Sequence, residues 1–181
     1  MQLEQFPVIA AVRTNAEFCD ALKSPINTIF LLHADILTLE SCIHAAHNTN
    51  KKLFVHLDMA EGIGKDKKGI TYLKNSGIDG IISTRPNMIK AAKDEGLLTV
   101  MRFFAIDSRS IDTATENIRM SSPDMVEMMP GILPEIIEEF RSTNRVSVIA
   151  GGLIRNKNDI YRALSAGAIA ISTGNRDLWN Q

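Results

Sequence analysis

Short apolar runs alternate with amphipathic stretches along nearly the whole chain. The runs begin near Val8, Thr28, Leu53, Asp79, Leu97, Asp124, Val146 and Ala168, at spacings of 18 to 27 residues. Such runs predict buried strands. Helical periodicity between them predicts helices over Asn15–Leu22, Leu39–His47, Gly69–Ser76, Asn87–Asp94, Ile111–Ser121, Leu133–Ser142 and Asn156–Ala166, with Thr14 and Ser108 among the expected N-caps. Each repeat is therefore one strand followed by a helix.

Eight such units predict a single α/β domain over residues 1–181, a small TIM-like (β/α)8 barrel. The physical reason is that parallel strands need crossover connections and that both faces of a parallel sheet have to be covered. An open, doubly wound sheet is the alternative. At 181 residues the barrel is smaller than usual, so its helices must be short.

Composition limits the classes of function. The chain carries 20 basic and 21 acidic residues and a net charge of -1, so it has no overall attraction to nucleic acid or membranes. No run reaches the roughly 18 apolar residues of a membrane span, and no leader pattern begins the sequence, so we expect a cytoplasmic protein. Cys19 and Cys42 form no metal-binding or disulfide pattern, and we expect neither cofactor nor metal.

The last two predicted strands each end in a polar loop that contains glycine. Val146–Ala150 runs into Gly151-Gly152, and Ala168–Ile171 runs into Ser172-Thr173-Gly174. In barrels of this kind, the loops after strands seven and eight often hold a phosphate against backbone N–H groups and a short extra helix, for which Arg176–Trp179 is placed. We therefore expect a phosphate site at Gly151, Gly152, Ser172, Thr173 and Gly174. Two tight turns without a ligand are the alternative.

Charged residues fall at the carboxyl ends of the other strands, where the chemistry of a barrel is carried out. The candidates are His56, Asp58, Glu61, Arg102 and Glu127. His56 and Asp58 are two residues apart, which predicts that both side chains lie on one face of a strand. A buried network that satisfies itself, such as an Arg102–Glu127 pair, is an equally good interpretation for any single residue. A divalent cation held by His56, Asp58 and Glu61 ranks below both.

The longest irregular segment, Met59–Gly69, contains three glycines and three lysines, Lys65, Lys67 and Lys68. It is longer than an ordinary strand-to-helix loop. We expect it to be mobile and to close over an anionic ligand or to contact a phosphate backbone, with Arg85 as a second cation. A solvated surface loop is the alternative.

Several blocks of the sequence resemble one known family. The chain resembles the glycerol-3-phosphate-responsive antiterminators from Pro7 to about Asp177, through the blocks His56–Asp66, Gly77–Arg85, Arg102–Ser108, Pro123–Asp124, Glu127–Gly131 and Ala150–Ile154. The resemblance implies a bacterial cytoplasmic regulator that senses glycerol 3-phosphate and binds leader mRNA to prevent premature termination in glycerol-utilisation genes.

This resemblance gives the expected site a ligand. The phosphate of glycerol 3-phosphate would contact the glycine loops, and its hydroxyls would face His56, Asp58, Glu61, Arg102 and Glu127, with no catalytic residue. The lysines of the Met59–Gly69 segment and Arg85 become candidates for contact with the ligand or RNA. A homodimer, which would double a cationic face, is a hypothesis motivated by the near-zero net charge.

Two other classes of function remain open from the sequence. One is an enzyme on the same barrel, an isomerase, aldolase or phosphodiesterase that acts on a small phosphorylated substrate. The other is a barrel that serves only as a protein-interaction module and binds no small molecule.

Overall fold

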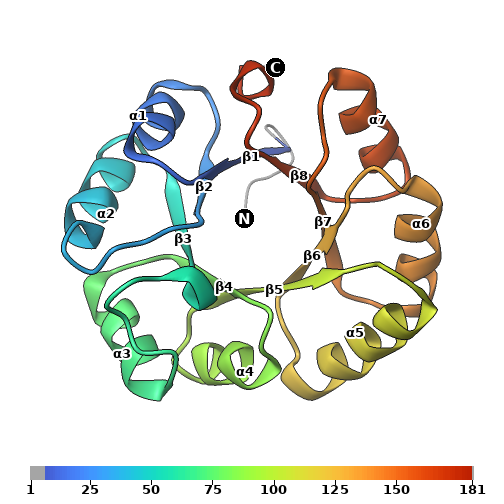
Figure 1. The fold of residues 1–181 in the computed structure, drawn as a ribbon, viewed down its shortest axis with the longest axis horizontal. Helices are drawn as coiled ribbons and strands as arrows, with labels where there is room; N and C mark the ends of the chain where they lie inside the picture. The colour runs from blue at the N-terminus through green and yellow to red at the C-terminus, as the bar shows by residue number, and fades with distance from the viewer. Residues whose placement is uncertain (1–6, 181) are drawn as a thin grey trace.

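The computed structural model describes residues 7–180 as one closed, parallel, eight-stranded barrel surrounded by helices (Figure 1). The strands are β1 (Val8–Val12), β2 (Thr28–Leu31), β3 (Lys52–His56), β4 (Gly80–Ser83), β5 (Leu98–Phe104), β6 (Met125–Met129), β7 (Ser147–Gly151) and β8 (Ala170–Thr173). The pairing of β1 with β8 closes the sheet. The predicted TIM-like barrel is therefore confirmed, and the open doubly wound sheet is excluded.

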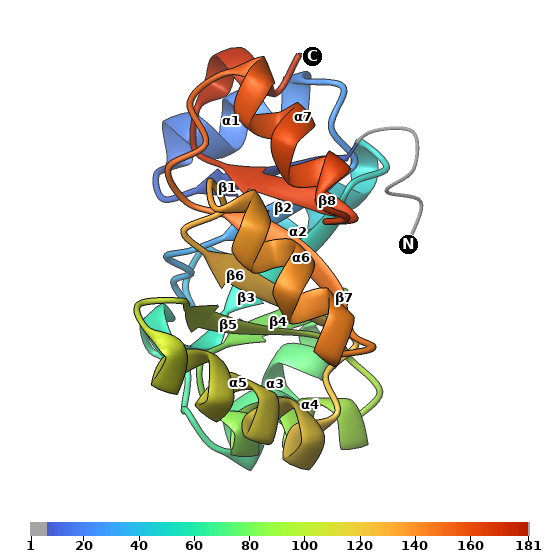
Figure 2. The same ribbon diagram turned by 90° about the vertical axis from the view of Figure 1, so that its right-hand side faces the viewer.

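The helices follow the strands in strict alternation and form the outer layer (Figure 2). Within the described part of the chain they are α1 (Asn15–Lys23), α2 (Leu39–Asn48), α3 (Lys67–Ser76), α4 (Pro86–Asp94), α5 (Ser108–Ser121), α6 (Pro134–Thr143) and α7 (Lys157–Ser165). Short 3-10 turns, η1 (Leu57–Met59) and η2 (Arg176–Leu178), follow β3 and β8.

Two helices begin earlier than predicted because an aspartate caps each one. Asp66 precedes α3 and its carboxylate accepts from the Gly69 N–H, so Lys67 and Lys68 lie in the first helical turn and not in the preceding loop. Asp107, not Ser108, caps α5 through the Ser110 N–H. The predicted cap at Thr14 is confirmed, since its side chain accepts from the Glu17 N–H.

The core has two layers because alternate residues of each strand face inward and outward. The outward residues pack against the helices in one large cluster. The inward residues fill the barrel with apolar side chains, among them Phe30, Phe54, Ile82, Val100 and Ile149. Phe30 and Phe54 meet there with ring centroids 5.5 Å apart. The amino-terminal part of the interior is thus a packed, mainly apolar core, and the inward ion pair of Arg102 and Glu127 lies toward the carboxyl end.

Within the described residues, β8 is followed by the short turn η2. Trp179 is buried, and its indole N–H donates to the Thr173 carbonyl at 2.9 Å. Arg176 forms an ion pair with Asp20 of α1. These contacts hold the terminal turn against the β8 loop and α1, which gives the short segment predicted after strand eight a fixed place.

At the opposite end of the barrel, Asp124 joins two strands. Its carboxylate accepts from the Thr99 N–H at 2.9 Å and the Thr99 hydroxyl at 2.7 Å, and Lys93 lies 3.1 Å away. Burial by itself raises the pKa of Asp124, but the bonds from Thr99 and Lys93 outweigh it and hold the pKa below its ordinary value of 3.8.

We predict that Asp124→Asn lowers the free energy of unfolding at pH 7 by about 1 kcal/mol, after allowance for the partial exposure of the carboxylate. Because the folded pKa is depressed, this stabilisation is complete above the unfolded pKa and is lost as the pH falls through the folded one. Urea unfolding at pH 7, 5 and 3 should show the two proteins converging in acid. Asp94→Asn, in an exposed pair with Lys90, is the matched control. A gap that stays constant to pH 3 would contradict the assignment.

Candidate functional site

A buried ion pair lies inside the barrel at the carboxyl end of β5 and β6. Arg102 and Glu127 are direct register partners, and Arg102 Nε donates to Glu127 Oε2 at 2.6 Å. The Glu127 side chain is 1% exposed and that of Arg102 is 11% exposed. Ser172 of β8 donates its hydroxyl to the second carboxylate oxygen, Oε1. Both oxygens of Glu127 are therefore occupied, while Arg102 has no partner among the described residues for its two terminal nitrogens.

Gly151 makes room for this network. A Cβ at this position would lie 2.5 Å from Glu127 Oε1 and 2.7 Å from Ser172 Oγ. Its carbonyl also accepts from the Gly131 N–H at 2.5 Å, which holds the loop after β6 against β7. The structure thus gives Gly151 a packing role at the site. Backbone N–H groups without a partner come from the loop that follows it.

A cavity of about 180 Å³ opens above the ion pair, between the loops that follow β7 and β8. Its lining includes six of the predicted ligand residues, Arg102, Glu127, Gly152, Ser172, Thr173 and Gly174. Gly152, Leu153, Ile154 and Gly174 belong to the lining, and their backbone N–H groups have no acceptor among the described residues. Unpaired N–H groups around a concave site are suited to an anion.

The hydroxyl of Thr173 connects the two loops. It donates to the Ile154 carbonyl at 3.2 Å and accepts from the Asn175 N–H at 3.1 Å. The Asn175 side chain adds a bond to the Arg155 carbonyl at 3.0 Å. The bonds to the Ile154 and Arg155 carbonyls join the two loops, and the Thr173 hydroxyl is occupied as both donor and acceptor.

One charged residue of the lining is not among the ligand residues predicted from the sequence. Arg13, the residue after β1, is exposed and lines the cavity. One of its terminal nitrogens lies 3.3 Å from the position that a Cβ on Gly174 would take. The position of Arg13 directly after β1 could have indicated its place in the site, because barrel closure brings the ends of β1 and β8 together.

His56 is the last residue of β3, and its side chain is buried. Its Nδ1 is the one buried side-chain nitrogen or oxygen in the described part of the chain that has no hydrogen-bond partner. Burial, with the charge of Arg102 as a second cause, lowers the pKa of His56 to about 4. The ring is therefore neutral at pH 7. His56 does not line the cavity itself.

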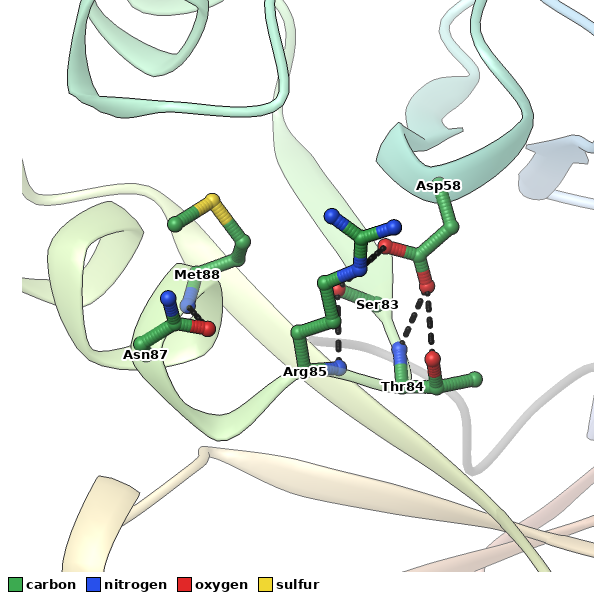
Figure 3. A network of polar contacts seen from close by, with 6 residues as sticks. All are labelled: Asp58, Ser83, Thr84, Arg85, Asn87 and Met88. Atoms are coloured by element: carbon green, nitrogen blue, oxygen red, sulfur yellow. Dashed lines mark hydrogen bonds and ion pairs between the residues drawn. The ribbon is translucent and has the colours of Figure 1, made fainter.

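Asp58 does not share a strand face with His56 as predicted, because β3 ends at His56 and Asp58 belongs to η1. Figure 3 shows its carboxylate directed at the loop after β4. It accepts from the Ser83 hydroxyl at 2.9 Å and from the N–H and hydroxyl of Thr84 at 2.7 and 3.0 Å, and it lies 3.6 Å from Arg85 Nε.

These contacts occupy the Asp58 carboxylate. Burial raises its pKa, but the hydrogen bonds from Thr84 and Ser83 lower it further than burial raises it, so the pKa is below its ordinary value. Asp58 is thus a charged residue that fixes the β4 loop and the exposed Arg85 at the start of α4 (Figure 3).

The remaining candidates lie farther out on the rim. Glu61 is exposed. Its backbone forms an isolated parallel β-bridge with that of Asp35, which joins the loops after β2 and β3. Lys65, Lys67 and Lys68 are exposed as well. Within residues 7–180, no cluster of three or more His, Cys, Asp or Glu side chains could hold a metal ion, so His56, Asp58 and Glu61 are not brought together as ligands. No described helix is long and apolar enough to cross a membrane.

Comparison with known proteins agrees with this arrangement. The family model of the glycerol-3-phosphate responsive antiterminator matches residues 8–179. The Escherichia coli K12 protein YgcP is 36% identical over 98% of this chain and 93% of its own length. The crystal structure of the glycerol uptake operon antiterminator regulatory protein from Listeria monocytogenes is 30% identical, with a TM-score of 0.94 over 99% of this chain and 97% of that one.

A second crystal structure extends the comparison. The glycerol uptake operon antiterminator-related protein from Thermotoga maritima is 32% identical, with a TM-score of 0.86 over 96% of this chain and 98% of that chain. Since both the family model and these relatives span almost the entire sequence, the chain belongs to the glycerol-3-phosphate-responsive antiterminator family.

Proposed function

We propose that this protein binds glycerol 3-phosphate in the cavity above Arg102 and Glu127, and that it acts in the cytoplasm on leader mRNA to prevent premature termination of glycerol-utilisation genes. The observation that carries the ligand assignment is the combination of a buried arginine that has free terminal nitrogens with four unpaired backbone N–H groups around one small cavity. Membership of the family supports the RNA and the effector.

The chemistry of the lining divides the ligand into two ends. A phosphate fits the N–H groups of Gly152, Leu153, Ile154 and Gly174, with Arg13 as the nearest exposed cation. The hydroxyls fit the deeper end. Ser172 gives its proton to Glu127 and can accept from a hydroxyl, and Arg102 can donate to one. A volume of about 180 Å³ suits a small polyol phosphate better than a nucleotide.

This division changes the roles expected from the sequence. Gly151 supports the phosphate loop by packing, and Asp58 and Glu61 act on the rim and not on the ligand. His56 is buried and neutral, but it does not line the cavity, so it is not among the proposed ligand contacts. The homodimer remains a prediction from charge balance.

The chemistry at the strand ends favours a sensor over a Schiff-base aldolase. Among the eight described strands, the only lysine is Lys52, the first residue of β3, and it therefore lies at the end of the barrel opposite the cavity. No strand in residues 7–180 presents an amine to the site for covalent catalysis.

A thermal-shift titration tests ligand binding. At glycerol 3-phosphate 100 times above its dissociation constant, one-site binding stabilises the protein by about 2.7 kcal/mol, which raises the melting temperature by several degrees. Glycerol and inorganic phosphate, each of which supplies half of the contacts, should have smaller effects. The ligand should be recovered unchanged by NMR after incubation. No shift at millimolar ligand would refute the proposal, and turnover would favour an enzyme.

Arg13→Gln should weaken binding without unfolding the protein. Arg13 is exposed, so its loss costs little stability, and a charged hydrogen bond to phosphate corresponds to roughly a 10- to 150-fold change in affinity. Calorimetric titration with glycerol 3-phosphate measures the change. Lys23→Gln, an exposed cation at the far end of α1, is the matched control. Equal affinities for the two variants would remove Arg13 from the site.

Two glycine variants separate packing from ligand contact. Gly151→Ala should lower the free energy of unfolding by about 3 kcal/mol, because the new methyl displaces Glu127 or Ser172 and leaves buried polar groups unpaired. Gly174→Ala should change it by less than about 0.5 kcal/mol, because its nearest neighbour is the flexible end of Arg13 at 3.3 Å. Urea unfolding without ligand distinguishes them, and similar losses for both would contradict the packing role of Gly151.

A further inference from the structure

Exposed apolar side chains gather at the carboxyl-end face of the barrel. Nine large hydrophobic residues of the described chain are exposed, and five of them lie in or beside the loops that follow strands, namely Leu37, Met59, Phe104, Ile106 and Leu153. The other four are spread over α3, α5, α7 and the loop before β8. A concentration of exposed apolar groups on one face marks an interaction surface.

Phe104 stands at the mouth of the site. It is the last residue of β5, two residues beyond Arg102, so its side chain extends from the same side of the strand. Its register partner, Met129, lines the ligand cavity. With 49% of its surface exposed, Phe104 presents an aromatic ring to solvent above the buried ion pair.

Exposed cations lie in other segments that follow strands at this end of the barrel. Lys65, Arg109 and Arg155 are exposed and form no ion pair within the described residues. The acidic neighbours Asp66 and Asp107 are instead used as helix caps, by the N–H groups of Gly69 and Ser110. The face thus combines an aromatic stacking platform with three exposed cations that form no ion pair within the described residues.

We propose that an unpaired stretch of RNA binds across this face, with a base stacked on Phe104 and with phosphates contacted by Lys65, Arg109 and Arg155. The inference rests on the proposed RNA-binding function and adds the place of the RNA, directly over the mouth that receives glycerol 3-phosphate. Unpaired bases stack on aromatic rings and cations follow the backbone, whereas a double helix offers no free base face.

The loop after β7 belongs to both surfaces. Leu153 contributes an unpaired N–H to the cavity, while its side chain is 55% exposed on the outer face. It has φ +61°, a left-handed conformation that is strained for a leucine. A ligand phosphate on this backbone stabilises that conformation, and with it the position of the side chain toward the RNA. This gives effector binding a direct route to RNA affinity.

Fluorescence anisotropy tests the location. The probes are a labelled, unstructured 20-nucleotide RNA and a blunt duplex of equal length, each titrated with and without glycerol 3-phosphate. Phe104→Leu, which keeps apolar volume and removes the ring, should weaken binding of the unpaired RNA about 5- to 150-fold. Lys65→Gln should reduce the salt slope by about 0.7. The matched controls, Tyr161→Leu on the exposed face of α7 and Arg145→Gln at the amino-end loops, should bind like the unmodified protein.

The outcomes separate the location from the proposed function. RNA binding that is weakened by the two controls, and not by Phe104→Leu or Lys65→Gln, would overturn the location and leave the regulator intact. A Phe104→Leu protein that loses the glycerol 3-phosphate thermal shift but keeps RNA affinity would make Phe104 a lid for the ligand. If the unmodified protein binds neither probe in either state, the RNA assignment fails together with its location, while the thermal shift still reports on the ligand site.

Discussion

The site depends on one buried charge pair, Arg102 with Glu127. Two opposite charges inside a barrel are costly unless each has its partner, and here the parallel register of β5 and β6 brings them together as direct neighbours. Ser172 of β8 donates its hydroxyl to the other carboxylate oxygen of Glu127. Because Gly151 has no side chain, there is space for this hydrogen bond. Four strands therefore have to close correctly before the pair is satisfied. Because an unpaired buried charge is costly, the observed β5–β6 register is favoured over registers shifted along the strand.

The same constraint divides the barrel into two functional halves. Below the ion pair the interior is apolar and packed, with Phe30 and Phe54 in contact. Above it, the loops after β7 and β8 leave their backbone N–H groups unpaired around a cavity. The packed half fixes the geometry of the loops, and the loops carry the groups proposed to bind the ligand. After β8, the Trp179 hydrogen bond and the Arg176–Asp20 pair anchor η2 against the rest of the barrel.

The rim residues act mainly by holding the loops. Asp58 ties η1 to the loop after β4, and the Asp35–Glu61 bridge joins the loops after β2 and β3. Asp66 and Asp107 cap the helices that follow. The carboxylates of Asp58, Asp66 and Asp107 thus accept hydrogen bonds within the protein, while Lys65, Arg109 and Arg155 at the same end of the barrel form no ion pair within the described residues.

The sequence by itself determined the repeat of strand and helix, the closed barrel, and the two glycine-bearing loops at its end, because apolar periodicity and turn residues are local signals. It also supplied Arg102 and Glu127 as members of the site. Only the tertiary structure decided which polar residues meet. Two residues of separation suggested that His56 and Asp58 share a strand face, but the strand ends between them, and where it ends depends on contacts with β4. The place of Arg13 beside Gly174 is likewise a product of barrel closure, which brings together residues that no local pattern connects.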